Sequence, residues 1–113
     1  MEKQAITKYV RLSAFRAREI TRLIQGKAVN EAMAIVNFCP RKSARLVGKT
    51  LRSATANAVN DERNPVAQED LFVKEATVGE GPTMKRFIPK ARGMAGRIRR
   101  RTSHIKIVVT DEE

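Results

Sequence analysis

The residues of this chain with the clearest chemical potential are the cations between Pro82 and Arg101. That segment holds no acidic residue and eight basic ones, which are Lys85, Arg86, Lys90, Arg92, Arg97, Arg99, Arg100 and Arg101. A small protein cannot bury charges at this density, because each isolated buried charge costs many kcal/mol. Lysine binds phosphate as a point charge, and arginine adds a planar fork that also stacks on bases. The segment is therefore either solvated or neutralised by a polyanion.

The charge of the whole chain is concentrated in that segment. The formal net charge is +11 over 113 residues, and the segment supplies eight of those charges. The other residues carry fifteen basic and twelve acidic groups, an excess of only three. A local basic excess is typical of a surface that binds nucleic acid or an anionic membrane, and we favour nucleic acid.

Residues for catalysis or metal binding are scarce. His104 is the only histidine and Cys39 the only cysteine, so no cluster of metal ligands can form around them. The run Gly79-Glu80-Gly81 lacks the Gly-Lys-Ser/Thr continuation of a phosphate-binding loop. We therefore expect neither an enzyme nor a protein with a cofactor or a metal site.

Three features predict a cytoplasmic location. No run of about eighteen apolar residues is present, so no transmembrane helix is expected. The start, Met1 to Gln4, leads to no apolar signal core. A lone Cys39 cannot form an internal disulfide, which fits a reducing compartment.

The N-terminal part predicts a strand followed by a helix. The residues Ala5–Arg11 include several β-formers and indicate a short strand. Ser13 is a candidate N-cap for the helix, and Gly26 is placed to cap its C-terminus. The expected apolar stripe consists of Ala17, Ile20, Leu23 and Ile24.

Two more helices are expected before residue 61. Asn30 is a candidate N-cap for a short helix that must end at Pro40. The next helix is predicted from about Arg41 to about Asn60, with Gly48 at the edge of its apolar stripe to permit close helix packing. The stripe consists of Ala44, Val47, Leu51, Ala54 and Ala58.

The same long helix carries a second, basic face. Five cations without an acid fall on one arc about 150° from the apolar stripe, and they are Arg41, Lys42, Arg45, Lys49 and Arg52. Most such faces are simply solvated, but a solvated face usually mixes signs. Solvation and polyanion contact therefore both remain open for this face.

Two predicted strands flank the basic segment. The residues Leu71–Val78 are rich in β-formers. Towards the end of the chain, Ile105, Ile107 and Val109 alternate with His104, Lys106, Val108 and Thr110, which is typical of a half-buried strand. Together they indicate a hairpin with arms of roughly 18 residues, which at ~3.3 Å per residue reaches up to ~60 Å. The predicted fold is α+β: three helices packed on a small antiparallel three-stranded sheet, with a long protruding β-hairpin. We expect one domain over residues 1–113, with a globular part at about 1–80 and 102–113 and the basic hairpin at about 81–101.

A slender basic hairpin suits folded RNA better than specific DNA. The sequence has no helix-turn-helix or zinc-finger pattern. Met84, Phe87, Ile88 and Met94 can lie against bases or form an apolar plug at the hairpin base. Two alternatives are a nucleic-acid chaperone that binds many RNAs and a membrane-active cationic segment. The second is disfavoured because the segment contains two Pro and two Gly and no helical apolar stripe.

Several motifs resemble one known family. They are Gly81-Pro82-Thr83-Met84-Lys85-Arg86, Pro89-Lys90-Ala91-Arg92-Gly93, Arg97-Ile98 and Arg101-Thr102-Ser103-His104-Ile105. In the helical part, Ser13-Ala14 with Arg16-Ala17-Arg18, Ile24 with Gly26-Lys27, and Ser53-Ala54 with Ala56-Asn57-Ala58 agree in order and spacing. Over nearly the whole chain the sequence resembles the bacterial form of large-subunit ribosomal protein twenty-two.

The resemblance implies a specific place and role. It implies a globular domain outside the large subunit near the tunnel exit, and a hairpin that lines the nascent-chain tunnel. The implied partners are large-subunit rRNA, bound early in assembly, the nascent chain, and neighbouring proteins such as ribosomal protein four of the same subunit. No membrane partner is expected.

The resemblance also implies a set of site residues. The expected rRNA-binding residues are Arg11, Ser13, Arg16, Arg18, Lys27, Lys42, Lys49, Met84, Lys85, Arg86, Lys90, Arg92, Arg97, Arg99, Arg100, Arg101, Ser103 and His104. The expected tunnel tip is Pro89, Lys90, Ala91, Arg92 and Gly93. Two positions depart from the family pattern: Met94 replaces the usual Arg after the tip glycine, and Gly79 replaces an Asp at the hairpin base.

Overall fold

The computed structural model describes residues 2–63, 65–81, 84–89, 95–100 and 102–111, and for 84–89 and 95–100 it describes the backbone. The elements in chain order are β1 (Glu2–Val10), α1 (Ala14–Ile24), α2 (Val29–Phe38), α3 (Lys42–Val59), a 3-10 turn η1 (Gln68–Asp70), β2 (Phe72–Glu80), β3 (Met84–Pro89), β4 (Ala95–Arg100) and β5 (Ser103–Thr110).

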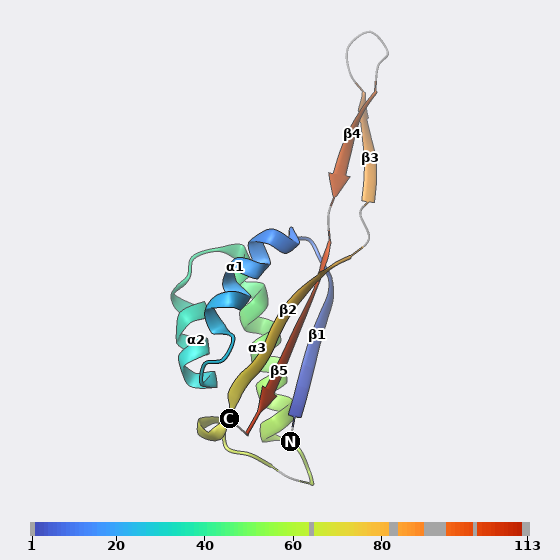
Figure 1. Ribbon diagram of the computed structural model, residues 1–113. Coiled ribbons are helices and arrows are strands. Elements are labelled where there is room, and N and C mark those ends of the chain that lie inside the picture. Colours follow the sequence, from blue (N-terminus) through green and yellow to red (C-terminus); the bar gives the residue numbers. More distant parts are fainter. Residues whose placement is uncertain (1, 64, 82–83, 90–94, 101, 112–113) are drawn as a thin grey trace.

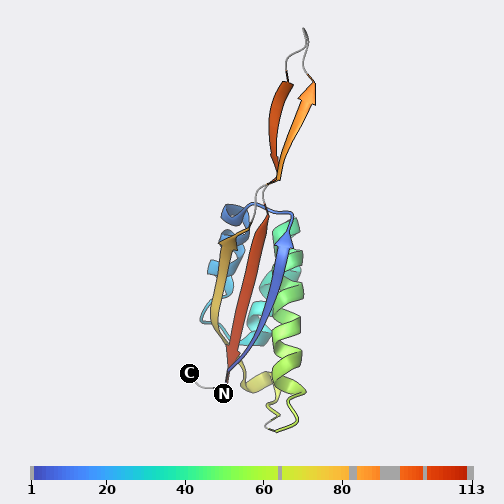
Figure 2. The ribbon, with the colours of Figure 1, turned by 90° about the vertical axis from the view of Figure 1, so that its right-hand side faces the viewer.

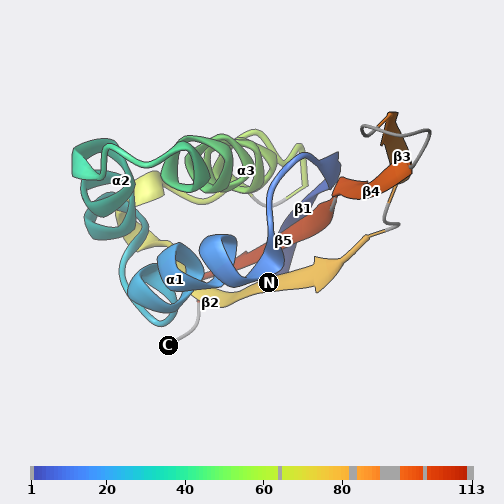
Figure 3. The same cartoon turned by 90° about the horizontal axis from the view of Figure 1, so that it is seen from above.

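The strands form a three-stranded sheet and a separate two-stranded one. In the larger sheet β5 lies between β1 and β2 and is antiparallel to both. The three helices cover one face of this sheet (Figures 1 and 3), and Figure 2 shows the sheet from its other face. Strands β3 and β4 pair with each other beyond the end of the sheet (Figure 1). The predicted α+β fold with a long hairpin is confirmed.

The core lies between the sheet and the helices. All five residues of the predicted stripe on α3 have no exposed surface. They meet the inward side chains of the sheet, which are Val73, Ala76, Val78, Ile105, Ile107 and Val109. Gly48 lets α2 approach closely, because a Cβ there would stand 3.2 Å from Val36 Cγ2. The apolar residues that recur at the helical period and those that recur at the strand period therefore pack together in one layer.

The helix boundaries confirm most of the predicted caps. Ser13 is the N-cap of α1, and its Oγ accepts a hydrogen bond from the Arg16 N–H at 3.4 Å. Gly26 follows the C-cap residue in the left-handed region, with φ of 82°, as expected for a helix stop. Helix α2 ends at Phe38, two residues before Pro40.

Two predictions about the helices are wrong. The N-cap of α2 is Ala28 rather than Asn30, because the Val29 N–H donates to Leu71 O at 3.0 Å and starts the helix against the chain before β2. The second error is Leu23, which is 50% exposed instead of belonging to the core stripe. Thr21 is buried in its place, and its hydroxyl donates to Arg18 O at 3.2 Å. A buried threonine with an internal acceptor is not visible in an apolar pattern.

The two ladders belong to one long antiparallel hairpin. Strands β2 and β5 pair up to Glu80 with Ser103, and the next described pair beyond the junction is Met84 with Arg100. Between them the Gly81 N–H donates to Thr102 O at 2.9 Å. The described atoms extend 63 × 28 × 17 Å, which agrees with a slender extension on a small layered core.

Candidate nucleic-acid interface

The outer ladder brings cations together across two strands. Its described strands carry five cations and no acid, and these cations are Lys85, Arg86, Arg97, Arg99 and Arg100. The register sets Lys85 directly opposite Arg99. Like charges in directly opposed positions destabilise a β-ladder. Pro89 ends β3 opposite Ala95. The remaining predicted hairpin residues, namely Lys90, Ala91, Arg92, Gly93, Met94 and Arg101, lie outside the described residues.

The junction between the two ladders is tightly packed. A Cβ added to Gly81 would stand 2.6 Å from Thr102 Oγ1 and 3.2 Å from His104 Nε2. Ser103 is fully buried, and its hydroxyl donates to Leu12 O at 2.6 Å. Because that hydroxyl is used inside the protein, Ser103 acts as a framework residue at this place.

His104 is held at the same junction by Tyr9. The Tyr9 N–H donates to His104 Nδ1 at 3.1 Å, and the two rings meet edge to face with centroids 5.0 Å apart. Tyr9 lies where the β1–β5 register shifts, between Thr7 and Val10, and it has φ of 57°. The imidazole is half-buried, and its Cε1–Nε2 edge faces Gly81.

The predicted site residues on and around α1 serve different purposes. Arg16 is exposed. Arg18 is half-buried, and its Nε and Nη2 donate to Val78 O at 3.3 and 2.9 Å, which fastens α1 to β2. Lys27 forms an ion pair of 3.8 Å with Glu31. Arg11 is exposed, and its backbone carbonyl accepts a hydrogen bond from Lys42 Nζ at 3.2 Å.

All five cations of the basic face on α3 are exposed. Arg41 pairs with Glu19 of α1, and Arg52 Nη2 donates to Asn37 Oδ1 at 3.4 Å. Among the described residues, Arg45 and Lys49 have no ion pair or hydrogen-bond partner for their side chains. Lys42 also has a partner, since it donates to Arg11 O, so the uncompensated charge of this face is on Arg45 and Lys49.

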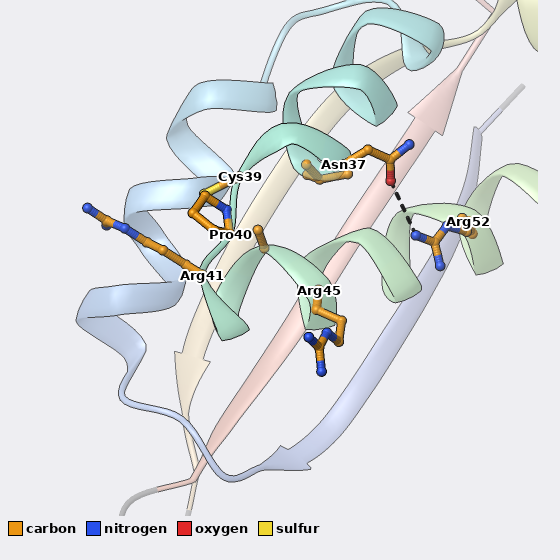
Figure 4. A pocket seen from close by; sticks show the side chains of 8 residues that line it. Asn37, Cys39, Pro40, Arg41, Arg45 and Arg52 are labelled. Carbon is orange, nitrogen blue, oxygen red and sulfur yellow. Dashed lines mark hydrogen bonds between the residues drawn. The ribbon is translucent and has the colours of Figure 1, made fainter.

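A cavity of about 220 Å³ opens where α2 meets α3 (Figure 4). Its lining combines three guanidinium groups with an amide and a thiol, and it consists of Val36, Asn37, Cys39, Pro40, Arg41, Ala44, Arg45 and Arg52. The sequence indicated the basic face but not this cavity, because nothing in a single helix shows which neighbour packs beside it.

The described residues contain neither a metal-binding cluster nor a helix that could span a membrane. No group of three or more His, Cys, Asp or Glu side chains there is placed to hold a metal ion. No helix in the described part of the chain combines the length and apolarity needed to cross a bilayer. The pKa of the Glu2 carboxyl is lowered, because Lys74 hydrogen-bonds the carboxylate and adds a positive charge beside it.

Comparison with known proteins gives a consistent family. The family model for ribosomal protein L22p/L17e matches residues 5–110. The large ribosomal subunit protein uL22 of Halothermothrix orenii is 49% identical over all of this chain and 98% of its own length. The uL22 proteins of Akkermansia muciniphila and Clostridium kluyveri are each 47% identical, over all of this chain and 99% and 100% of their lengths. The chain therefore belongs to the ribosomal protein L22p/L17e family, a family of structural rather than enzymatic proteins of the large ribosomal subunit.

Proposed function

We propose that this chain binds rRNA as a structural protein of the large subunit, with its globular part near the tunnel exit and its hairpin along the nascent-chain tunnel. The observation that carries the proposal is the ladder of β3 and β4, which stands beyond the sheet with five cations and no acid in its described strands (Figure 1). A shape of this kind can enter spaces in folded RNA that a globular surface cannot.

The energetics of the ladder support an external partner. An isolated two-stranded hairpin is at best marginally stable in water. The opposition of Lys85 and Arg99 weakens it further. Phosphates on both sides remove that repulsion and release counterions from the RNA. If all eight cations of the segment meet phosphates, the log–log salt slope of binding is about −6 to −7.

The globular part contributes a second contact surface. The exposed or half-exposed cations that we assign to it are Arg11, Arg16, Lys27, Lys42 and Lys49, with His104 at the junction. Arg18 and Ser103 are left out, since their polar groups are hydrogen-bonded to Val78 O and Leu12 O. Ser13 is the N-cap of α1. This surface anchors the protein, while the hairpin staples RNA segments during subunit assembly.

The proposed partners in the tunnel are the nascent chain and the loop of ribosomal protein four. Both proposals follow from the resemblance of the hairpin motifs to the family pattern. A photo-reactive amino acid at position 90 tests them in purified ribosomes with a stalled nascent chain. We expect cross-links to the chain and to protein four, and none when the probe replaces Arg63 in the polar loop after α3.

The decisive experiment removes the outer ladder. A variant that lacks residues 84–98 and is closed with Asn-Gly should still co-sediment with large subunits after a high-salt wash, because the globular surface is intact. The tunnel should be altered, measured as changed chemical reactivity of tunnel rRNA. Complete loss of the variant from subunits would contradict the proposed anchor, and free wild-type protein in the lysate would contradict the ribosomal role.

A further inference from the structure

The basic face of α3 divides into two rows by residue type. At 100° per residue, Arg41, Arg45 and Arg52 fall within an arc of about 40°. Lys42 and Lys49 fall within about 20° of each other, roughly 70° away from the arginines. The cavity between α2 and α3 is lined by all three arginines and by neither lysine. One helix therefore presents two surfaces with different binding chemistry.

The arginine row is held in place at both ends. Arg41 is paired with Glu19 of α1, and Arg52 reaches Asn37 at the end of α2 (Figure 4). Arg45 lies between them and has no partner for its side chain within the described structure. The ends of the row are thus pre-organised, while the middle guanidinium keeps its donors for a ligand.

Gly48 makes this arrangement possible. A Cβ at that position would stand 3.2 Å from Val36 Cγ2 and 3.7 Å from Arg52 Nη2. The missing side chain lets α2 come close and lets the Arg52 guanidinium fold back toward it. A helical glycine costs up to about 1 kcal/mol relative to alanine, so its presence calls for a packing reason such as this one.

An exposed aromatic residue, Phe38, is the chain neighbour of two residues that line the cavity, although it does not line the cavity itself. Phe38 is 89% exposed, the largest value among the exposed large apolar residues of the described chain. It lies between Asn37 and Cys39, which both line the cavity. Exposed aromatic rings next to cations are typical of surfaces on which unpaired bases stack.

We propose that this place, which we call the arginine corner (Asn37, Phe38, Arg41, Arg45 and Arg52), receives one unpaired nucleotide of rRNA. Arg45 takes the phosphate, and the base lies against the exposed ring and the guanidinium planes. The cavity of about 220 Å³ is below the usual range for larger ligands, which fits a single planar group. The lysine row binds neighbouring phosphates as point charges.

This inference rests on the proposed rRNA binding and favours a nucleotide over an acidic protein segment. A carboxylate would use the guanidinium groups but would leave the Phe38 ring in water. A nucleotide uses both groups, since its phosphate is bound by the charges and its base by the planes.

The test separates planarity from charge. In one variant, Arg45→Lys with Arg52→Lys, the net charge stays the same but the planar groups are lost. The matched control is Arg22→Lys with Arg63→Lys, two exposed arginines outside the assigned binding surfaces. Binding to large-subunit rRNA is measured over a series of salt concentrations, and unpaired rRNA bases are probed chemically with and without protein. We expect the arginine variant to bind about tenfold more weakly at an unchanged salt slope, and one unpaired base to lose its protection. The control should match wild type.

The possible outcomes have separate meanings. If the arginine variant and wild type show equal affinity and equal base protection, the proposed nucleotide site is wrong. The proposed function would still stand in that case, because wild type binds rRNA. Absence of rRNA binding by wild type would overturn both. Loss of a protein–protein cross-link from the arginine corner, with the base pattern unchanged, would assign the corner to an acidic protein segment instead.

If the double variant does not fold, Phe38→Ala replaces it, because a side chain this exposed contributes little to folding. This variant should also weaken rRNA binding and remove the protection of the same base.

Discussion

The inner and outer halves of the hairpin use the same pairing but are stabilised in different ways. In the inner half, β2 and β5 place Val73, Val78 and Ile107 against the helices, with little or no exposed surface. In the outer half, β3 and β4 pair only with each other. The inner half is therefore stabilised by the protein's own core, and the outer half depends on what surrounds it.

This contrast shows how one chain is adapted to two environments, its own apolar core and the surroundings of the outer ladder. Apolar residues at every second position suit the boundary between the helices and the sheet. The outer strands instead carry cations, two in β3 and three in β4, which suit a boundary with phosphate. The change from one to the other occurs across Gly81 and Thr102, whose backbone groups are hydrogen-bonded at 2.9 Å. The following predictions test whether the two halves are as independent as this contrast indicates.

The largest effect is expected from removal of residues 84–98. The isolated variant should unfold at nearly the temperature of the full chain, because the core is untouched. Its affinity for large-subunit rRNA at moderate salt should fall by on the order of a thousandfold, and its salt slope should flatten by several units. Calorimetry and filter binding measure the two quantities. A large loss of thermal stability would show that the halves are coupled.

The next effect comes from Leu51→Ala in the core. Leu51 has no exposed surface, so its truncation should lower the free energy of unfolding by about 2–5 kcal/mol. The matched control is Leu23→Ala, since Leu23 is 50% exposed on α1 and should change stability by less than about 1 kcal/mol. Urea denaturation followed by circular dichroism gives both values. Equal effects would mean that the assigned core is wrong.

The junction is expected to be sensitive to a single methyl group. Gly81→Ala would bring a Cβ to within 2.6 Å of Thr102 Oγ1, so we expect a loss of about 1–3 kcal/mol. Gly79→Ala is the control, because a Cβ there meets nothing within 4 Å. The two positions are two residues apart, with Gly79 in β2 and Gly81 just after its end, and urea denaturation compares the variants. If both are neutral, the junction is looser than its geometry indicates.

A charge reversal should change the outer half in two opposite directions. Lys85→Glu places an acid opposite Arg99, which should stabilise the free ladder by about 0.2–1 kcal/mol. The same variant should bind rRNA more weakly, with a salt slope flatter by about one to two. Amide hydrogen exchange of β3 and β4 measures the first effect and filter binding the second. Stronger RNA binding would show that preformed order matters more than phosphate contact.

The smallest effect concerns pH and the inner sheet. Lys74 lowers the pKa of Glu2 in the folded state, so the pair contributes stability above the pKa of an unfolded glutamate. That contribution is lost as the pH falls through the lower folded pKa. Glu2→Gln should remove a small part of the pH dependence of unfolding between about pH 3 and 5. Because both side chains are about half exposed, 0.5 M salt should reduce the effect, and a salt-independent loss would contradict an ion pair.

Most of the fold could be predicted from sequence because its patterns are local. The stripe of α3, the N-cap Ser13 and the stop at Pro40 all follow from residue types at fixed spacing. The observed strand limits differ from the predicted ones by a few residues; for example, β1 begins at Glu2 rather than Ala5. The start of α2 was mispredicted because a backbone hydrogen bond from Val29 to Leu71 decides it, and such long-range pairing leaves no local signal. The family match also confirms the resemblance, the ribosomal location in the cytoplasm and the non-enzymatic role.

The candidate site was only partly visible in the sequence. Charge counts indicate the hairpin and the basic face of α3, since no acid interrupts either. They cannot separate a cation that meets solvent from one such as Arg18, which is fastened to Val78 O. The sequence also does not single out Phe38, because residue type alone does not show whether an aromatic ring is exposed or buried. These distinctions depend on tertiary packing.

The contact between Tyr9 and His104 fixes the tautomer of the imidazole at the hairpin base. Because Nδ1 accepts the Tyr9 N–H, the proton of the neutral ring is on Nε2. That nitrogen is on the side of Gly81, close to where the chain leaves the sheet. At Nε2 the only histidine of the chain therefore offers a hydrogen-bond donor, the kind of group that a phosphate oxygen or a base carbonyl accepts. The Tyr9 backbone, with φ of 57°, thus decides which ring nitrogen carries the donor hydrogen.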